Sequence, residues 1–197
     1  MVQSPSKERE LLRRTHLLDA SLQVFARYGF RKTSMDEVAR AAQVSRQGLY
    51  LHFPTKEDLF RATAEHLLEG ALQQAHAALA TDAELEARLV NAFDEWVGRF
   101  TGMFAETAND LTDASKLLVQ PLVVSYEMRF LASVAAALRD AGLGKVYKGS
   151  GLNPQKLARV LHSSARGFKY AATSRADFVA DFTLTVRALC VQIVARP

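Results

Sequence analysis

Residues 33–59 read TSMDEVARAAQVSRQGLYLHFPTKEDL, which is two short helical patterns separated by a three-residue turn. In the first pattern, Ser34 and Glu37 have the spacing of a capping box, in which the two residues exchange hydrogen bonds at the helix start. Ser45 is placed to cap the second helix, which we expect over residues 46–52. Two short helices joined in this way are typical of a helix-turn-helix, whose second helix enters the major groove of DNA.

The turn between the two helices, residues 42–44, has an unusual residue at its centre. Such turns commonly place glycine where Gln43 stands, because the residue there tends to need a positive φ. We expect Gln43 to adopt that conformation at a cost of roughly 1 kcal/mol or more. The apolar positions predict a compact three-helix core that includes Phe25, Val38, Leu49 and Phe53.

The outer face of the second helix is short, polar and basic. Arg46 could fork onto the O6 and N7 atoms of guanine, Gln47 could pair with adenine, and Gly48 would let the backbone come close. Three further side chains suit phosphate oxygens: Tyr50, His52 and Lys56. We therefore predict that DNA is contacted by Thr33, Ser34, Ser45, Arg46, Gln47, Gly48, Tyr50, His52 and Lys56.

The order of these features closely resembles the N-terminal DNA-binding domain of the TetR (tetracycline-repressor) family of bacterial transcription regulators. The likeness covers about His16 to Phe60, from a first helix ending in FARYGF through the caps, the turn and Lys56. It implies an all-α protein of about nine helices, in which a three-helix helix-turn-helix domain precedes a larger ligand-binding and dimerisation domain. We expect the first domain over residues 1–60 and the second over residues 61–197.

The charge of the chain is concentrated in its first third. Residues 1–61 contain eleven Lys and Arg against seven Asp and Glu, whereas residues 62–197 contain fourteen of each. The whole formal charge of +4 therefore lies where DNA is expected to bind. Four basic side chains near the N-terminus could also reach the DNA backbone, or could simply be solvated: Lys7, Arg9, Arg13 and Arg14.

Hydropathy gives no indication of a membrane protein. The longest apolar runs fall well short of a span of about 20 residues. The first ten residues, MVQSPSKERE, are charged and lack the apolar core of a secretory signal. We therefore expect a cytoplasmic protein that has no membrane partner.

Helical periodicity continues along the rest of the chain. The patterns and caps predict helices over residues 9–28, 55–79, 121–141, 153–171 and 174–194. Gly29 is expected to close the first of these helices. Thr81 with Glu84 is expected to cap a further helix, Pro121 to stand in a first helical turn, and residues 142–151 to form a flexible loop.

Large aromatic rings recur three or four residues apart after residue 84. Such a stripe is often the core of a helical bundle, but a cavity lined by Phe and Trp also suits an apolar ligand. The resemblance favours a small apolar or aromatic effector. His162 could touch such a ligand, although a histidine in this setting is more often a core or interface residue. The candidate ligand contacts are Phe93, Trp96, Phe100, Phe104, Tyr126, Phe130, His162 and Phe168.

The last two helices, within residues 153–195, have more apolar surface than one domain can cover, which suggests self-association. In the TetR family the corresponding pair forms a four-helix bundle with its symmetry mate. We therefore expect a homodimer that binds a palindromic double-stranded DNA operator and represses transcription until the effector releases it. The alternative is a helical protein-interaction or lipid-binding module that does not bind DNA sequence-specifically.

The sequence gives no support to a catalytic or metal site. The five histidines are never paired at ligand spacing, and Cys190 is the single cysteine, which rules out an internal disulfide. Neither a Gly-x-Ser-x-Gly elbow nor a phosphate-binding glycine loop is present. We therefore expect no enzyme activity, no cofactor and no bound metal.

Overall fold

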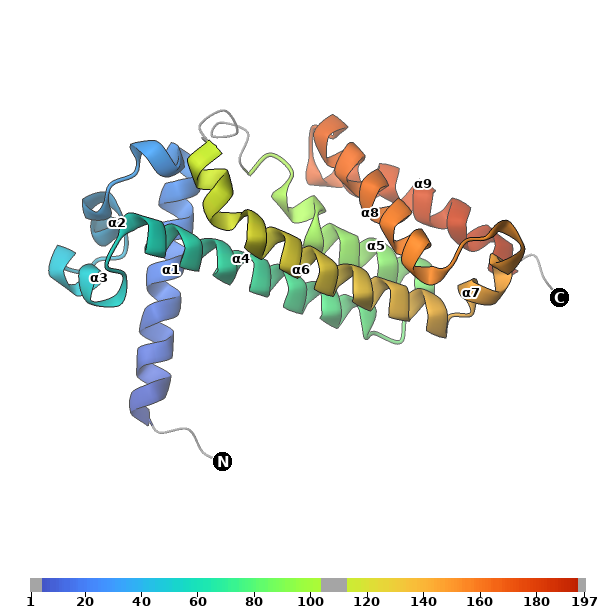
Figure 1. Cartoon of the computed structure of the whole chain (residues 1–197), viewed down its shortest axis with the longest axis horizontal. Coiled ribbons are helices and arrows are strands. Elements are labelled where there is room, and N and C mark those ends of the chain that lie inside the picture. The colour runs from blue at the N-terminus through green and yellow to red at the C-terminus, as the bar shows by residue number, and fades with distance from the viewer. Residues whose placement is uncertain (1–4, 104–112, 195–197) are drawn as a thin grey trace. The chain divides into compact units, whose positions relative to one another are not determined.

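The computed structural model describes residues 5–103 and 113–194, which fold into helices and loops without a strand in these two ranges (Figure 1). Within the two described ranges, two short 3-10 helices accompany the α-helices: η1 (Gly98–Phe100) and η3 (Lys148–Ser150). The all-α fold expected from the sequence is confirmed. The α-helices of the described ranges are α1 (Pro5–Lys32), α2 (Met35–Ala41), α3 (Arg46–His52), α4 (Lys56–Leu79), α5 (Leu85–Trp96), α6 (Asp113–Asp140), α7 (Leu143–Val146), α8 (Pro154–Ala171) and α9 (Arg175–Val194).

The helices divide into two compact units. Unit 1 comprises Met1–Glu69 with Phe104–Val123, and unit 2 comprises Gly70–Met103 with Val124–Pro197. Two helices contribute to both units, because α4 passes from unit 1 to unit 2 after Glu69 and α6 does so after Val123. The chain is therefore connected between the units by continuous helices.

Unit 1 has a core of closely packed apolar side chains from α1, α2, α3 and α4. The ring of Phe60 lies 5.0 Å from that of Phe25 and 4.8 Å from that of Phe30. All four core residues expected from the sequence are buried there, which confirms the predicted three-helix packing. The buried members are Leu17, Leu18, Ala20, Val24, Phe25, Phe30, Met35, Val38, Ala39, Ala42, Leu49, Phe53 and Leu59.

Side-chain caps begin the short helices at the predicted residues. The amide of Glu37 donates to Ser34 Oγ at 3.2 Å while the Ser34 amide donates to Glu37 Oε2 at 2.7 Å, which completes the capping box of α2. Ser45 Oγ accepts from the Gly48 amide at 3.0 Å at the start of α3. Because each cap satisfies backbone N–H groups that a helix start leaves free, these residues fix where α2 and α3 begin.

The turn between α2 and α3 places Gln43 at φ 55°, a conformation that side-chain-bearing residues rarely adopt. Gln43→Gly is expected to raise the free energy of unfolding of unit 1 by about 0.5–1 kcal/mol, because glycine adopts positive φ without steric cost. Gln47→Gly, the same exchange inside α3, is the matched control and is expected to lower stability by about 1 kcal/mol. Urea denaturation of the two variants tests this; a Gln43 variant less stable than wild type would show that the turn is unstrained.

Several boundaries differ from those expected. Helix α1 begins at Pro5 rather than near Arg9, since proline at the start of a helix costs no hydrogen bond. Gly29, at φ 78° and ψ 169°, interrupts α1 as predicted. The Thr81 hydroxyl donates to the Ala78 carbonyl at 3.0 Å and so closes α4 instead of capping α5.

Two expectations for the second half of the chain were wrong. Helix α6 begins at Asp113, so that Pro121 lies inside the helix and not in its first turn. Residues 142–151, expected as a flexible loop, contain α7 and η3. Gly142 and Gly151 have positive φ at the borders of these two short helices, so the glycines mark the ends of helical turns and not an extended loop.

The core of unit 2 is an aromatic cluster formed by α5, α6 and α9. The Phe93 ring lies 4.9 Å from that of Phe130 and 4.7 Å from that of Phe182. Trp96 stacks on Phe130 at 5.0 Å, and Phe178 stacks on Phe182 at 5.8 Å. These contacts hold the three helices together in the interior of the unit.

Candidate functional site

The outer face of α3 is exposed because the inner face is fixed in the core. Leu49 is fully buried and Phe53 follows directly after the helix, also buried. With the Ser45 cap setting the start of the helix, the side chains of Arg46, Gln47 and Tyr50 are left exposed to solvent. A helix anchored on one side and polar on the other can enter the major groove of DNA.

Arg46 is loosely held in the free protein. Its Nη1 lies 3.1 Å from Asp36 Oδ2, with both side chains more than half exposed, and its guanidinium lies 5.5 Å from the Tyr50 ring. The Tyr50 hydroxyl and the Asp36 carboxylate raise the pKa of Arg46, which therefore stays charged. An exposed ion pair contributes about 0–1 kcal/mol, whereas a bidentate contact with guanine contributes about 1–3 kcal/mol, so Arg46 can exchange Asp36 for a base.

Lys56 and Thr33, two of the predicted DNA contacts, point into unit 1. Lys56 Nζ donates to the carbonyl oxygens of Phe30 and Thr33, each at 3.0 Å, and lies 4.6 Å from the Phe30 ring. The Thr33 hydroxyl is buried and donates to the Gly29 carbonyl at 2.7 Å. Carbonyl groups at the end of α1 lack helical partners, and these two side chains satisfy some of them. The structure thus gives both residues a structural contact.

The other predicted DNA contacts differ in their exposure and in the groups that they contact. Ser34 and Ser45 are exposed and serve as helix caps. A Cβ on Gly48 would stand 3.1 Å from Ser45 Oγ, so the glycine leaves room for that cap as well as for the backbone. His52 is half-buried and faces a groove shared with α1.

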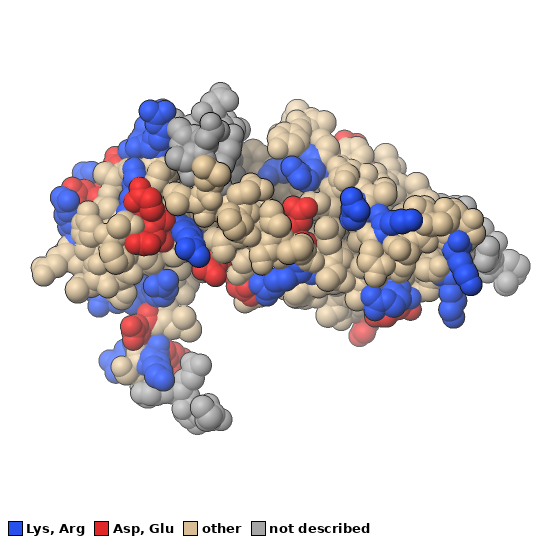
Figure 2. All heavy atoms as spheres, in the orientation of Figure 1, with Lys and Arg blue, Asp and Glu red and all other residues tan. Residues whose placement is uncertain are grey.

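This groove lies beside the first three turns of α1, all of whose side chains from Ser6 to Arg14 are exposed. Its lining residues are Ser6, Arg9, Glu10, Arg13 and His52. Figure 2 shows basic side chains, with acidic ones among them, on this projecting end of α1. Arg9 and Arg13 are four residues apart, which places them on one face of a helix, but nothing in the sequence indicated that this face meets His52.

Most of the predicted ligand contacts lie in or beside the aromatic cluster of unit 2. Phe93, Trp96, Tyr126, Phe130 and His162 are buried. Two others, Phe100 and Phe168, are half-buried, and the predicted contact at Phe104 lies outside the described residues. Of the predicted contacts, Phe93, Trp96 and Phe130 pack together in the cluster, so a ligand that enters among them has to displace ring contacts.

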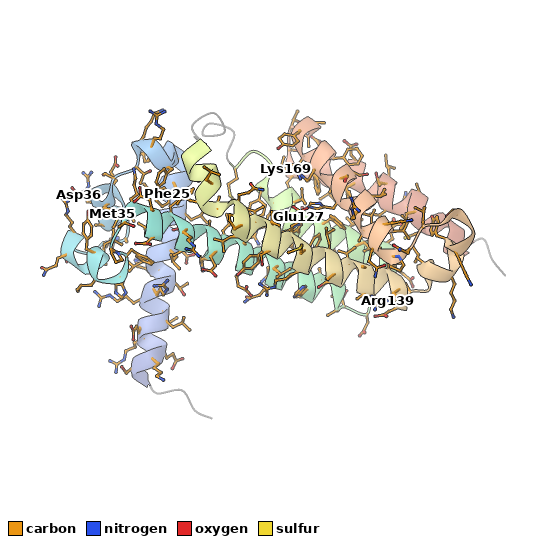
Figure 3. All side chains as sticks on the ribbon, viewed as in Figure 1. Phe25, Met35, Asp36, Glu127, Arg139 and Lys169 are labelled. Carbon is orange, nitrogen blue, oxygen red and sulfur yellow. The ribbon has the colours of Figure 1, made fainter. Side chains whose placement is uncertain are left out.

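Charged side chains of α6 and α8 contact two of the predicted ligand residues, His162 and Phe100; Figure 3 labels Glu127 and Lys169. His162 Nδ1 lies 3.4 Å from Glu127 Oε1, and burial lowers the pKa of His162 although Glu127 opposes this. Lys169 Nζ lies 5.6 Å from the centre of the Phe100 ring. Burial and the charge of Arg166 lower the pKa of Lys169. The sequence analysis did not single out either Lys169 or Arg166, because neither belongs to a motif.

The outer faces of α8 and α9 expose large apolar side chains. Val160 and Tyr170 on α8 are 50% and 85% exposed, and Leu184 on α9 is 63% exposed. Small residues flank them on the same exposed faces: Ser163, Gly167, Ala176, Ala180 and Ala188. An apolar face lined with small residues allows another helix to approach closely.

No group of three or more His, Cys, Asp or Glu that could hold a metal ion occurs in the described ranges. Cys190 is buried, and burial raises the pKa of its thiol. One helix of these ranges, Leu117–Asp140, is long and apolar enough by composition to cross a membrane. Its Phe130, Val134 and Leu138 are buried in the protein, and core helices pass the same test.

The N-terminal region of the chain is similar in sequence to known proteins. The bacterial regulatory proteins of the tetR family share a sequence pattern that matches residues 17–63. The transcriptional regulator AcrR of Shigella flexneri is 47% identical over 47 residues, which are 24% of this chain and 22% of that protein. Across three such relatives the match spans 22–40% of their own length.

Solved structures resemble the whole fold. A TetR-family regulator from Mesorhizobium loti superposes with a TM-score of 0.70 at 18% identity, covering 96% of this chain and 98% of the other. The regulator FadR from Bacillus subtilis, solved with stearoyl-CoA, superposes with a TM-score of 0.63 at 16% identity, covering 88% and 96% of the two chains. At these identities the likeness concerns the fold alone.

Proposed function

Because the chain belongs to the TetR family of bacterial regulatory proteins, we propose that it is a cytoplasmic transcriptional repressor that binds a palindromic operator as a homodimer. The relatives are DNA-binding regulators and not enzymes. The observation that supports the proposal most strongly is the exposed face of α3. This face carries Arg46, Gln47 and Tyr50, while the buried Leu49 on the opposite side anchors the helix in the core.

The proposed interface contacts both base edges and phosphates of the DNA. Arg46 and Gln47 contact bases in the major groove, and Tyr50 contacts a phosphate. The groove between α1 and His52 receives the neighbouring phosphate backbone through Arg9 and Arg13. Lys56 and Thr33 are assigned a structural role at the end of α1, where their side chains donate to the carbonyl groups of Phe30 and Gly29.

Dimerisation is proposed through the outer faces of α8 and α9, where Val160, Tyr170 and Leu184 are exposed. Two copies related by a twofold axis would then bind two half-sites of the operator. The two α3 helices have to stand about 34–36 Å apart to enter successive major grooves of B-DNA. The palindromic operator follows from the symmetry of the dimer.

An effector is proposed to bind in unit 2 beside the aromatic cluster and to release the operator. FadR, a protein of similar fold, was solved with stearoyl-CoA, which has a long apolar chain. Helix α4 belongs partly to unit 1 and partly to unit 2, so a ligand that shifts it can alter the distance between the two α3 helices. A hundredfold preference of the ligand for the shifted state corresponds to about 2.7 kcal/mol per site.

Arg46→Ala tests the assignment of base recognition. The variant is expected to lose about 1–3 kcal/mol of discrimination at one operator base pair, because a bidentate contact to guanine is removed. Genomic fragments selected by the wild-type protein would supply the operator, and affinities for single-base variants of it would then be compared by fluorescence anisotropy.

Arg13→Ala is the matched control, since it removes the same charge from α1. It is expected to weaken binding to all sequences alike and to reduce the slope of log affinity against log salt by about one unit. Equal, sequence-independent losses in both variants would show that Arg46 contacts phosphate and not a base. If the wild-type protein selects no genomic fragment, the proposal that the chain is a DNA-binding regulator is refuted.

A further inference from the structure

Two neighbouring cations, Lys169 and Arg166, lie in the last turns of α8. Lys169 is half-buried near the end of α8, where Figure 3 labels it, and its ammonium faces the Phe100 ring at 5.6 Å. Arg166 lies one helical turn earlier. Within the ranges 5–103 and 113–194, neither side chain forms an ion pair with a carboxylate.

The position of Lys169 is unfavourable for its charged form when no ligand is bound. Burial and the positive charge of Arg166 lower the pKa of Lys169. Burial also lowers the pKa of His162; Glu127 opposes this, and Arg166 adds a smaller lowering. The charged form of Lys169 is therefore disfavoured at this position. A cation–π contact with Phe100 contributes only about 0.5–1 kcal/mol at a partly exposed site.

Carboxylates on the neighbouring helices are already engaged. Glu127 on α6 lies 3.4 Å from His162, and Glu95 on α5 pairs with Arg99 at 3.2 Å and with Arg175 at 2.9 Å. Side chains of these helices therefore leave Lys169 and Arg166 available to an anion from outside. The half-buried ring of Phe100, beside the Lys169 ammonium, provides apolar contact for the body attached to that anion.

We propose that the effector has an apolar body and one anionic group, such as a carboxylate, sulfonate or phosphate, which Lys169 and Arg166 bind while Phe100 contacts the body. This inference rests on the proposed function, because it specifies the chemistry of the effector of unit 2. Hydrogen bonds from ammonium and guanidinium groups to an anion are about twice as strong as neutral ones, so the charge of the ligand would dominate its selection.

The test compares two fluorescent probes with the same aromatic body, 8-anilinonaphthalene-1-sulfonate and the uncharged N-phenyl-1-naphthylamine. Trp96 is the one tryptophan of the chain, so energy transfer from it reports a probe bound near the aromatic cluster. The full-length protein is expected to bind the sulfonate at least tenfold more tightly than the uncharged probe. Lys169→Met is expected to lose about tenfold in sulfonate affinity and to bind the uncharged probe as before.

Two further variants make the result specific. Lys169→Arg retains the charge and is expected to retain sulfonate binding, and Lys148→Met, which removes an exposed lysine of the same unit, is expected to leave both affinities unchanged. Equal affinity of wild type for both probes, or a parallel loss of both in Lys169→Met, overturns the inference. Operator binding is measured separately: a chain that selects no DNA but shows the sulfonate preference refutes the proposed function and leaves this ligand chemistry standing.

Discussion

Leu184→Asp is expected to convert a dimeric protein into a monomer and to lower operator affinity about a hundredfold or more. Leu184 is 63% exposed on the outer face of α9, where a carboxylate facing its own symmetry mate would be desolvated and repelled. A dimer gains its affinity from two linked half-site contacts, and avidity of this kind is typically worth 10²–10⁴-fold. Sedimentation at about 10 μM and anisotropy with the selected operator measure the two effects.

Leu117→Asp provides the control for this result. Leu117 is a more exposed leucine, at 74%, and it lies on α6 in unit 1, whereas α8 and α9 belong to unit 2. The control should remain a dimer with unchanged operator affinity. A dimeric Leu184→Asp protein, or a monomeric Leu117→Asp protein, would place the interface elsewhere.

The features that could be predicted from the sequence are those decided within a few residues. Ser34 and Ser45 cap α2 and α3 because a hydroxyl three residues before an amide can reach it wherever the chain turns into a helix. Gln43 has positive φ because the geometry of the turn requires it, whatever the side chain. The buried positions of α3 followed from helical spacing alone.

The features that were missed depend on residues far apart in the sequence. Lys56 has the charge of a phosphate ligand, but the end of α1, 26 residues away, offers it carbonyl oxygens inside unit 1. Lys169 and Phe100 belong to different helices, so their contact has no counterpart in a local pattern. Pro121 suggested a helix start because proline favours that position, and only the tertiary fold shows that α6 continues through it.

Gly98→Ala is expected to lower the free energy of unfolding of unit 2 by about 1–3 kcal/mol. A Cβ added to Gly98 would stand 2.5 Å from a ring carbon of Phe178 and 2.5 Å from Asp94 Oδ1. Neither neighbour can move freely: Phe178 is fully buried and stacked on Phe182, and Asp94 accepts two hydrogen bonds from Arg175 at 2.8 Å. Overpacking of a rigid site costs about 1–3 kcal/mol and occasionally more.

Gly149→Ala is the matched control for this clash. Nothing lies within 4 Å of a Cβ at Gly149. The free energy of unfolding of the Gly149→Ala variant should therefore stay within about 0.5 kcal/mol of the wild-type value. Urea denaturation followed by Trp96 fluorescence reports unit 2, because Trp96 stacks in its core. Combining Gly98→Ala with Phe178→Leu should recover part of the loss, since the smaller side chain vacates the position of the ring. A Gly98→Ala protein as stable as wild type would mean that Phe178 and the Asp94–Arg175 pair yield without cost, and the close packing of α9 against η1 would then contribute little to stability.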